Sequence, residues 1–261
     1  MKRRDFLQVL PTLAMAHSGC ATAGRARSLR VLSYNLHHGE GTDGRVDLER
    51  IARVIRESRA DLVALQEIDV NTARTGRVDQ AAEYVRLTGL HGKFGQAIDF
   101  QGGAYGQMLL SRWPLDDFRV HQLPNPNRLE QRIAISALVT LPGGHRLRFI
   151  GVHLDANGDD GDRWLQAGRL QDLFANDLMP AIMAGDFNDR PESRVMTRML
   201  SLWADASAAS PQPTIPSELP QARIDFVLLR PPGAWRAVQS KVLPESVASD
   251  HRALLVEIRV R

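Results

Sequence analysis

Carboxylate, amide and imidazole side chains stand at the ends of short apolar segments at six places in this chain. They are Asn35, Glu67, His153, the pair Asp186 and Asn188, Asp225, and the pair Asp250 and His251. Each one alone is readily explained as a cap or a turn residue. Together they offer oxygen ligands for a hard divalent cation, and imidazoles that carry protons or charge. This combination favours metal-assisted hydrolysis of a phosphoester.

Zinc chemistry finds little support in the sequence. The single cysteine, Cys20, excludes a disulfide framework and a multi-cysteine zinc site, and the HExxH spacing of zinc proteases does not occur. The chain has 261 residues, of which 43% are hydrophobic and 24% charged. This is an ordinary globular composition, and the length fits one α/β or all-β domain.

Hydrophobic periodicity predicts the elements that must position these side chains. Alternation indicates a strand at 29–36, and helical spacing indicates a helix at 47–60 with Asp47 as its N-cap. Further strands are predicted at 61–68, at five places between 93 and 152 with a turn at 141–145, at 181–184, and near 223–229, 235–242 and 252–260. Further helices are predicted at 79–88, 162–176 and 192–200, and a loop at 206–222. The pattern predicts an α/β fold in which two sheets pack face to face with helices outside.

Eight segments resemble a known superfamily in sequence and in order. They are SYNLHHG (33–39), LQEID (65–69), GQMLLSRWPL (106–115), QRIAISALV (131–139), VHLD (152–155), AGDFND (184–189), RIDFVLL (223–229) and SDHRALLVEI (249–258). The chain resembles the endonuclease/exonuclease/phosphatase superfamily, which includes DNase I. The resemblance implies a four-layer α/β/β/α sandwich, DNase I-like. Residues 35–44 and 74–80 are most similar to bacterial metal-dependent hydrolases related to the C-terminal domain of a yeast GPI-anchor remodelling protein.

The resemblance also implies a metal site. Glu67 would be the principal Mg²⁺ ligand, with Asn35 beside it and Asp250 assisting. One position departs from the family pattern, because His37 stands where some members carry a carboxylate. If the first strand continued, His37 would share the face of Asn35 and turn toward the metal, which would favour Mn²⁺. The alternative is that His37 contacts solvent or the edge of the substrate.

Catalytic roles follow from the same resemblance. Asp186 would orient or deprotonate the attacking water, and Asn188 would hold a phosphate oxygen. His251 would contact the scissile phosphate, and Asp225 would fix its ring and favour the charged form. His153 would be a general acid or a phosphate ligand.

Three arginines are candidate contacts for the phosphate groups of a substrate. Arg132 matches a family arginine near the scissile phosphate. Arg74 and Arg77 lie on the loop after Glu67, where they would hold a second phosphate or a headgroup, or remain solvated. The acidic stretch 155–162 follows His153 and would repel a polyanion near the mouth of the site.

The charge balance argues against a general affinity for nucleic acid. The chain carries a formal net charge of +3, but residues 1–30 contribute six basic groups and one acid, which leaves the remainder at −2. Binding to duplex DNA rests on many Lys and Arg contacts to phosphates. The near-neutral body therefore favours a smaller substrate, although a local basic cleft would still permit nucleic acid.

The first 27 residues resemble an export signal. Lys2, Arg3 and Arg4 precede a short apolar run, and Arg3-Arg4-Asp5-Phe6-Leu7 resembles a twin-arginine signal. Cleavage after the small residues 21–23 would release a periplasmic or extracellular protein, and a lipoprotein box at 18–20 would instead anchor it through Cys20. Residues 28–261 form the predicted catalytic domain.

The sequence thus predicts an exported, metal-dependent phosphodiesterase that acts on a lipid headgroup or a small phosphodiester, as a monomer. A secreted Mg²⁺-dependent endonuclease or exonuclease is the alternative. It would need a basic groove built from Arg74, Arg77, Arg112, Arg128 and Arg132. A catalytically inactive binding module is a third hypothesis, disfavoured because the candidate catalytic residues are intact.

Overall fold

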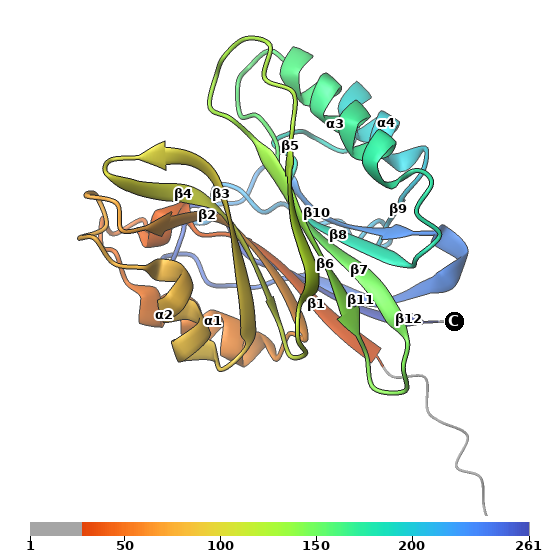
Figure 1. The fold of residues 1–261 in the computed structure, drawn as a ribbon, viewed down its shortest axis with the longest axis horizontal. Coiled ribbons are helices and arrows are strands. Elements are labelled where there is room, and N and C mark those ends of the chain that lie inside the picture. The colour runs from red at the N-terminus through yellow and green to blue at the C-terminus, as the bar shows by residue number, and fades with distance from the viewer. Residues whose placement is uncertain (1–27, 261) are drawn as a thin grey trace, which may run out of the picture.

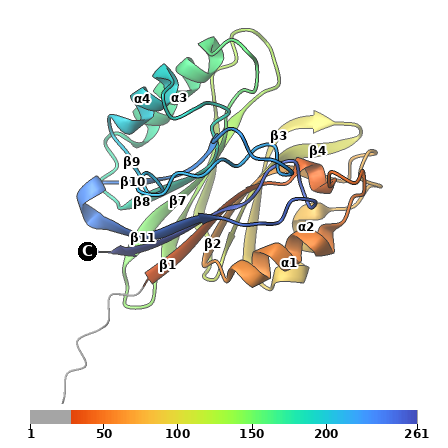
Figure 2. The same cartoon turned by 180° about the vertical axis from the view of Figure 1, so that it is seen from behind.

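The computed structural model describes residues 28–260. The predicted export signal at 1–27, including Cys20, lies outside the described residues. The described chain forms two mixed six-stranded sheets that pack face to face, with two helices on the outer face of each (Figure 1). The view from behind shows the same layers in reverse (Figure 2). The predicted α/β/β/α sandwich is confirmed.

The first sheet has the strand order β11-β12-β1-β2-β4-β3. Its strands are β1 (Ser28–Asn35), β2 (Leu62–Val70), β3 (His91–Phe100), β4 (Gly103–Ser111), β11 (Trp235–Val242) and β12 (Leu254–Val260). Only β1 and β2 run parallel, and the other neighbours in this sheet are antiparallel.

The second sheet has the order β5-β6-β7-β8-β10-β9. Its strands are β5 (Asp116–Gln122), β6 (Ile133–Thr140), β7 (Arg146–His153), β8 (Ala181–Asp186), β9 (Ala204–Asp205) and β10 (Asp225–Arg230). The turn predicted at 141–145 joins β6 to β7, with the Leu141 amide donating to the His145 carbonyl at 2.7 Å. The segment predicted as a loop at 206–222 contains no strand.

Helices cover the outer face of each sheet. They are α1 (Leu48–Ser58) and α2 (Gln80–Thr88) on the first sheet, and α3 (Gly161–Phe174) and α4 (Arg194–Leu200) on the second, with short 3₁₀ turns at His37–Gly39 and Pro232–Ala234. Asp47 caps α1 as predicted, because its side chain accepts the Arg50 amide. Within residues 28–260 no helix has the length and apolar character that a membrane span requires.

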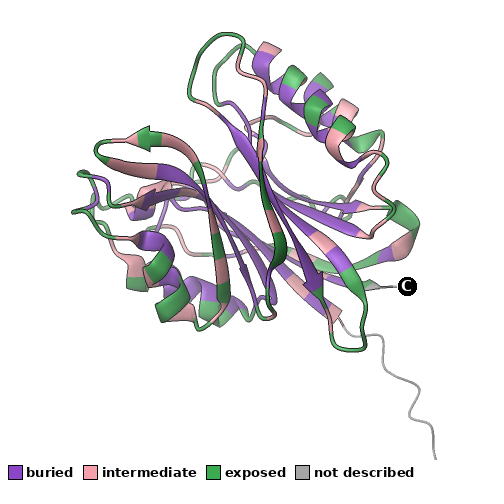
Figure 3. Cartoon of the chain, in the orientation of Figure 1, coloured by how far each residue is buried: buried purple, intermediate pink, exposed green. Residues whose placement is uncertain are grey.

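Three hydrophobic cores hold the layers together. The largest lies between the sheets and includes Val31, Leu109 and Phe149. The other two lie between each sheet and its helices. Burial follows this layering, since the strands are mostly buried and the outer helix faces are exposed (Figure 3). Only the strand ends and loops are left to build a site that solvent reaches.

The strand register brings the chemistry-bearing residues to one edge of the sandwich. His153 pairs with Asp186 at the ends of the parallel strands β7 and β8. Asp225 begins β10 opposite Asp186. In the first sheet, Asn35 ends β1 beside Gln66 of β2. These strand ends meet across the inter-sheet core, so one cleft edge collects residues from both sheets.

Candidate active site

Asn35 links the two sheets at this edge. Its Nδ2 donates to Glu67 Oε1 at 3.0 Å and to Asp186 Oδ2 at 3.1 Å. Asn35 is 1% exposed and its Oδ1 accepts the His37 amide. The Asn35 side chain thereby holds the carboxylates of Glu67 and Asp186, which come from different sheets, close together.

A β-bulge turns Glu67 toward this point. The pairing of β2 with β4 shifts register between Gln66 and Ile68, and Glu67 adopts the left-handed φ of 62°. Strict alternation would place Glu67 on the face of Leu65, which packs in the core beneath the helices. Bulges commonly re-aim a side chain near a functional site. The pattern of apolar residues along the strand does not reveal this bulge.

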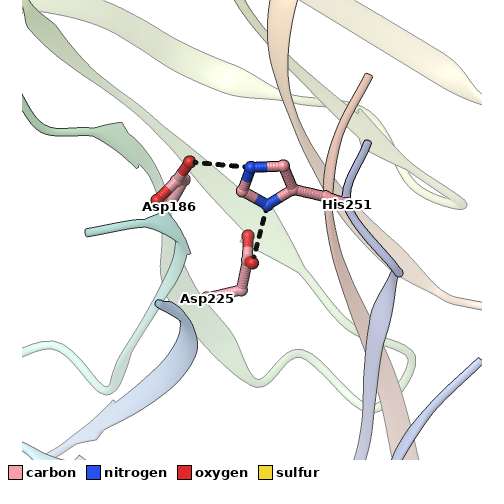
Figure 4. Close-up of side chains that lie close together, drawn as sticks. All are labelled: Asp186, Asp225 and His251. Carbon is pink, nitrogen blue, oxygen red and sulfur yellow. Dashed lines mark hydrogen bonds and ion pairs between the residues drawn. The ribbon is translucent and has the colours of Figure 1, made fainter. Parts of the chain in front are cut away.

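An Asp–His–Asp trio forms the buried centre of the site (Figure 4). His251 Nδ1 lies 2.9 Å from Asp225 Oδ2, and His251 Nε2 lies 3.6 Å from Asp186 Oδ2. All three residues are less than 5% exposed. Because each ring nitrogen faces a carboxylate, the trio holds an imidazolium between two acceptors.

The charges within this trio shift the pKa values of the His251 imidazole and the Asp186 carboxyl group. Burial opposes the charge of His251, but Asp225 and then Asp186 outweigh it and raise the pKa of His251 to about 10. Burial, followed by the repulsion of Asp225, raises the pKa of Asp186 to about 7. His251 is therefore a cation at neutral pH, and Asp186 is a base of suitable strength.

His153 is held as a neutral imidazole. Arg132 Nη1 donates to His153 Nδ1 at 3.0 Å. Arginine only donates, so Nδ1 accepts and the ring proton resides on Nε2, which lies 3.7 Å from Asp186 Oδ2. Burial, and then the charges of Arg132 and His251, hold the pKa of His153 well below its usual range. The ring can donate a hydrogen bond to a substrate oxygen without carrying charge.

Two further predicted residues flank the trio. The Asn188 amide donates to Asp186 Oδ1 at 2.8 Å, and Asn188 Nδ2 donates to the Leu154 carbonyl at 3.0 Å. Asp250 adjoins His251, and its Oδ1 lies 3.2 Å from Ser249 Oγ. Ser249, which the sequence analysis did not single out, donates to the Asn35 carbonyl at 2.7 Å. It ties the His251 loop to the end of β1.

The predicted phosphate-binding arginines occupy different places. Arg132 is 7% exposed and pairs with Glu130 at 2.8 Å. Arg74 forms a bidentate pair with the fully buried Asp69, at 2.7 and 2.8 Å. Arg77 is exposed and lies against Gly102 in the turn between β3 and β4. The structure thus places Arg132 against His153, Arg74 in the wall of a cavity that Arg132 also lines, and Arg77 at the β3–β4 turn.

The extrapolation of the first strand to His37 is wrong. Strand β1 ends at Asn35, and His37 begins a 3₁₀ turn with a left-handed φ of 46°. Its Nδ1 lies 3.2 Å from the Glu40 carbonyl. The Asn35 side chain accepts the His37 amide and so stops the strand, because a local side-chain bond replaces the ladder. Alternation along β1 therefore gives no reason to expect the His37 imidazole to face the metal.

The donor set fits a hard divalent cation. Glu67 is half-buried, lines a cavity and is anchored by Asn35, which leaves carboxylate oxygens for a cation. Asp186, Asp225 and His251 also have ligand atoms within 4.8 Å of one another. The two carboxylates hold His251 as a cation, so a metal ion at the trio would have to displace a ring proton before the imidazole could bind it.

A match to a protein-family model covers the segments that build this site. A model of the endonuclease/exonuclease/phosphatase family matches residues 32–251. The chain belongs to this family. The match spans every strand end that contributes to the site, from Asn35 to His251. Family members are hydrolytic enzymes that act on phosphoesters, and metal dependence is typical of them.

Solved structures of family members and other proteins share the fold. A family protein from Beutenbergia cavernae is 24% identical, with a TM-score of 0.74 over 90% of this chain and 72% of its own. A protein from Enterococcus faecalis is 18% identical, with a TM-score of 0.77 over 89% of this chain and all of its own. A mannosyl-6-phosphatase from Bacteroides thetaiotaomicron is 17% identical, with a TM-score of 0.72 over 88% and 99%. These likenesses show the DNase I-like sandwich.

Proposed function

We propose that this family member is an exported, Mg²⁺-dependent phosphodiesterase that cleaves a lipid headgroup or a small phosphodiester by attack of water on phosphorus. One observation carries the proposal. The Asp225–His251 pair stands 3.6 Å from Asp186, at the same edge as the Asn35–Glu67 contact. A base, a fixed cation and oxygen ligands for a metal thereby converge on one point.

The side chains divide the work of the reaction. Asp186 Oδ2 accepts the proton of the attacking water, and Asn35 holds this carboxylate in place. His251 offsets the charge that develops on the non-bridging oxygens, and His153 donates a hydrogen bond to one of them. As water forms its bond to phosphorus, the P–O bond to one alcohol breaks, and that alcohol leaves as an alkoxide that takes a proton from solvent. Asn188 lies close enough to Asp186 to hold a further phosphate oxygen.

Glu67 and Asn35 would hold the divalent cation, with Asp250 at the rim. When bound, Mg²⁺ supplies Lewis-acid polarisation of the phosphate. Mg²⁺ is favoured over softer ions because the donors are oxygens. Mn²⁺ accepts the same ligands and is expected to substitute.

The arginine placement favours a small substrate over a polynucleotide. The nuclease alternative needs one groove built from Arg74, Arg77, Arg112, Arg128 and Arg132. Arg112 instead follows the far end of β4 and pairs with Asp61 at 3.0 Å, at the edge opposite the site. Arg74 and Arg132 are engaged by acids within the protein. The mannosyl-6-phosphatase among the structural neighbours supports a sugar phosphoester as one substrate class for this fold.

Export and a monomeric state complete the proposal. Export rests on residues 1–27, with their paired arginines and short apolar run. The sequence is compatible with two ways of processing the export signal, which are cleavage after residues 21–23 and lipidation of Cys20. Mass spectrometry of the protein recovered from a bacterial envelope would separate them, because a lipidated Cys20 adds a diacylglyceryl mass.

The metal assignment is tested by chelation. We expect EDTA to abolish hydrolysis of bis(4-nitrophenyl) phosphate, and Mg²⁺ or Mn²⁺ to restore it. Glu67→Gln should weaken activation by metal, measured as the metal concentration for half-maximal rate. Glu57→Gln, on the exposed face of α1, is the matched control. Full activity in EDTA would remove the metal from the proposal.

The substrate class is tested with supercoiled plasmid beside the small diester. We expect the small diester to be hydrolysed and the plasmid to remain closed. Asp186→Asn serves as the inactive control for contaminating nucleases. Plasmid nicking by the wild-type protein alone would replace the proposal with the secreted nuclease.

A further inference from the structure

A cavity of about 180 Å³ opens beside the active site. Glu67 and Arg132 form the side that it shares with the catalytic residues. Its other walls are Arg74, Phe100 and Tyr105, from the β2–α2 loop and the β3–β4 hairpin, and Glu130. Pockets that enclose a drug-sized ligand measure roughly 300–1,000 Å³. This one has room for a single group of a substrate.

Three of the four charged side chains that line this cavity, all except Glu67, are already paired inside the protein. Arg74 is bound through Nε and Nη2 to Asp69, which is fully buried. Arg132 is bound to Glu130. A second phosphate could bind only Nη1 of Arg74 without breaking this pair, and the carboxylates of Glu67 and Glu130 in the same walls would repel it. The cavity is therefore poorly suited to a second anion.

Donors and acceptors alternate around the same walls. Arg74 Nη1 lies outside the Asp69 pair, and the Tyr105 hydroxyl lies beside Arg132. Glu130 supplies acceptor oxygens. Arg132 is 93% buried, and its Nε has no hydrogen-bond partner among the described residues. Hydroxyl groups both donate and accept, whereas a phosphodiester only accepts. The walls match a ligand that carries several hydroxyls.

The apolar part of the cavity consists of Ile98, Phe100 and Tyr105, and it is not an open stacking slot. The Arg74 guanidinium lies 4.7 Å from the Phe100 ring centroid and 5.5 Å from that of Tyr105. A nucleobase binds best on an uncovered aromatic face. Since Arg74 covers one face of each ring here, Ile98 and the remaining ring surface are left for the C–H groups of a saturated ring.

We propose that this cavity is the subsite for one alcohol of the phosphodiester, and that it takes an uncharged polyhydroxylated ring, such as a hexose or a cyclitol. The inference rests on the proposed phosphodiesterase function and names its substrate class. Tyr105, Phe100 and Glu130 are its specificity-determining residues. Phosphorus would then lie between this subsite and the Asp186–His251 pair, within reach of Glu67.

The test compares three chromogenic diesters that share the 4-nitrophenolate leaving group. Their second alcohols are myo-inositol, at its 1-phosphate, thymidine, at its 5′-phosphate, and ethanol. We expect the full chain with Mg²⁺ to hydrolyse the inositol diester with a kcat/KM about tenfold or more above that of the ethyl diester, the gain of one or two hydrogen bonds.

Tyr105→Phe and Phe100→Ala should each reduce this inositol-to-ethyl ratio to near one. Phe94→Ala is the matched control, because Phe94 is a half-buried residue of the same strand that packs in the core beneath the helices. It should leave the ratio unchanged. Thermal unfolding of each variant establishes that it is folded, and the ratio cancels any general loss of activity.

The outcomes separate the two levels of the proposal. Hydrolysis of all three diesters at similar kcat/KM would overturn the subsite and leave the phosphodiesterase function standing. Preference for the thymidine diester that the variants abolish would assign the cavity to a nucleoside instead. An inositol preference that survives in both variants would place the polyol elsewhere. Hydrolysis of none of the diesters would overturn both the function and the subsite.

Discussion

At the scale of single residues, the Asp225–His251 pair is the feature on which the proposed chemistry depends most. We expect Asp225→Asn to lower kcat for bis(4-nitrophenyl) phosphate by about 10²–10⁴-fold, the range of a lost acid–base or charge-stabilising group. The cause is a fall in the pKa of His251, whose cationic form Asp225 favours most strongly. NMR titration of the His251 ring should report that fall. Wild-type kcat in this variant would remove the imidazolium from the mechanism.

The same pair makes stability depend on pH. The pKa of His251 is about 10 in the folded protein and about 6.5 in an unfolded chain. The contribution of the His251 ion pair to the free energy of unfolding is therefore complete below about pH 6.5 and is lost as the pH rises through about 10. Urea unfolding of the wild type and of His251→Gln, both in EDTA, measures it. The difference in the free energy of unfolding should shrink from pH 6.5 to 10, and a difference that grows would contradict the ion pair.

Residue types predicted which side chains gather at the edge, but not how they are held. Asn35, Glu67, Asp186 and His251 meet as their positions at strand ends suggested, and their roles stay predictions. Glu130 was missed, although an extended chain places it on the same side as Arg132 two residues later. The sequence pattern gives no signal for the cavity, because its walls come from segments far apart in the chain.

At the scale of elements, periodicity predicted the strands and helices to within a few residues. The short strand β9 (Ala204–Asp205) was missed, because two residues are too few for any alternation to show. The bulge at Glu67 was also missed, since it depends on the partner strand β4 rather than on β2 itself. The error at His37 has a similar origin, in a side-chain bond that overrides alternation.

The β7–β8 pair holds His153 level with Asp186, and Gly185 permits its close approach. A Cβ at Gly185 would lie 2.0 Å from the Val152 carbonyl oxygen. We expect Gly185→Ala to lower the free energy of unfolding by about 3 kcal/mol, the upper range for overpacking, and to reduce activity through misplaced strand ends. Gly233→Ala, where a Cβ meets nothing within 4 Å, is the control and should change stability by less than about 1 kcal/mol. Urea unfolding measures the free energy of unfolding of both variants. Equal values for the two would show that β7 and β8 can move apart without a cost in stability.

At the scale of the whole molecule, the placement of charge decides how a substrate approaches. Among the arginines proposed for a nucleic-acid groove, Arg112 is paired to Asp61 at the far edge, whereas Arg74 and Arg132 line the cavity beside the site. Near the mouth, one charge of the acidic stretch is paired, since Arg194 binds Asp160 at 2.6 Å, and the neighbouring Asp189 is paired with Arg163 at 3.2 Å. Charges that are paired in this way generate little long-range field.

Hydrolysis should therefore depend little on ionic strength. A protein that neutralises several phosphates of a polynucleotide loses affinity steeply with salt, by about 10³-fold or more between 50 and 200 mM. For this chain we expect kcat/KM for a small diester to change by less than about threefold over the same range, because one phosphate meets only His251, Arg132 and the metal ligands. Initial rates at fixed Mg²⁺ and increasing KCl measure the slope. A steep decrease, together with cleavage of plasmid at low salt, would show that the dispersed arginines act as one surface after all, and would favour the nuclease over the phosphodiesterase.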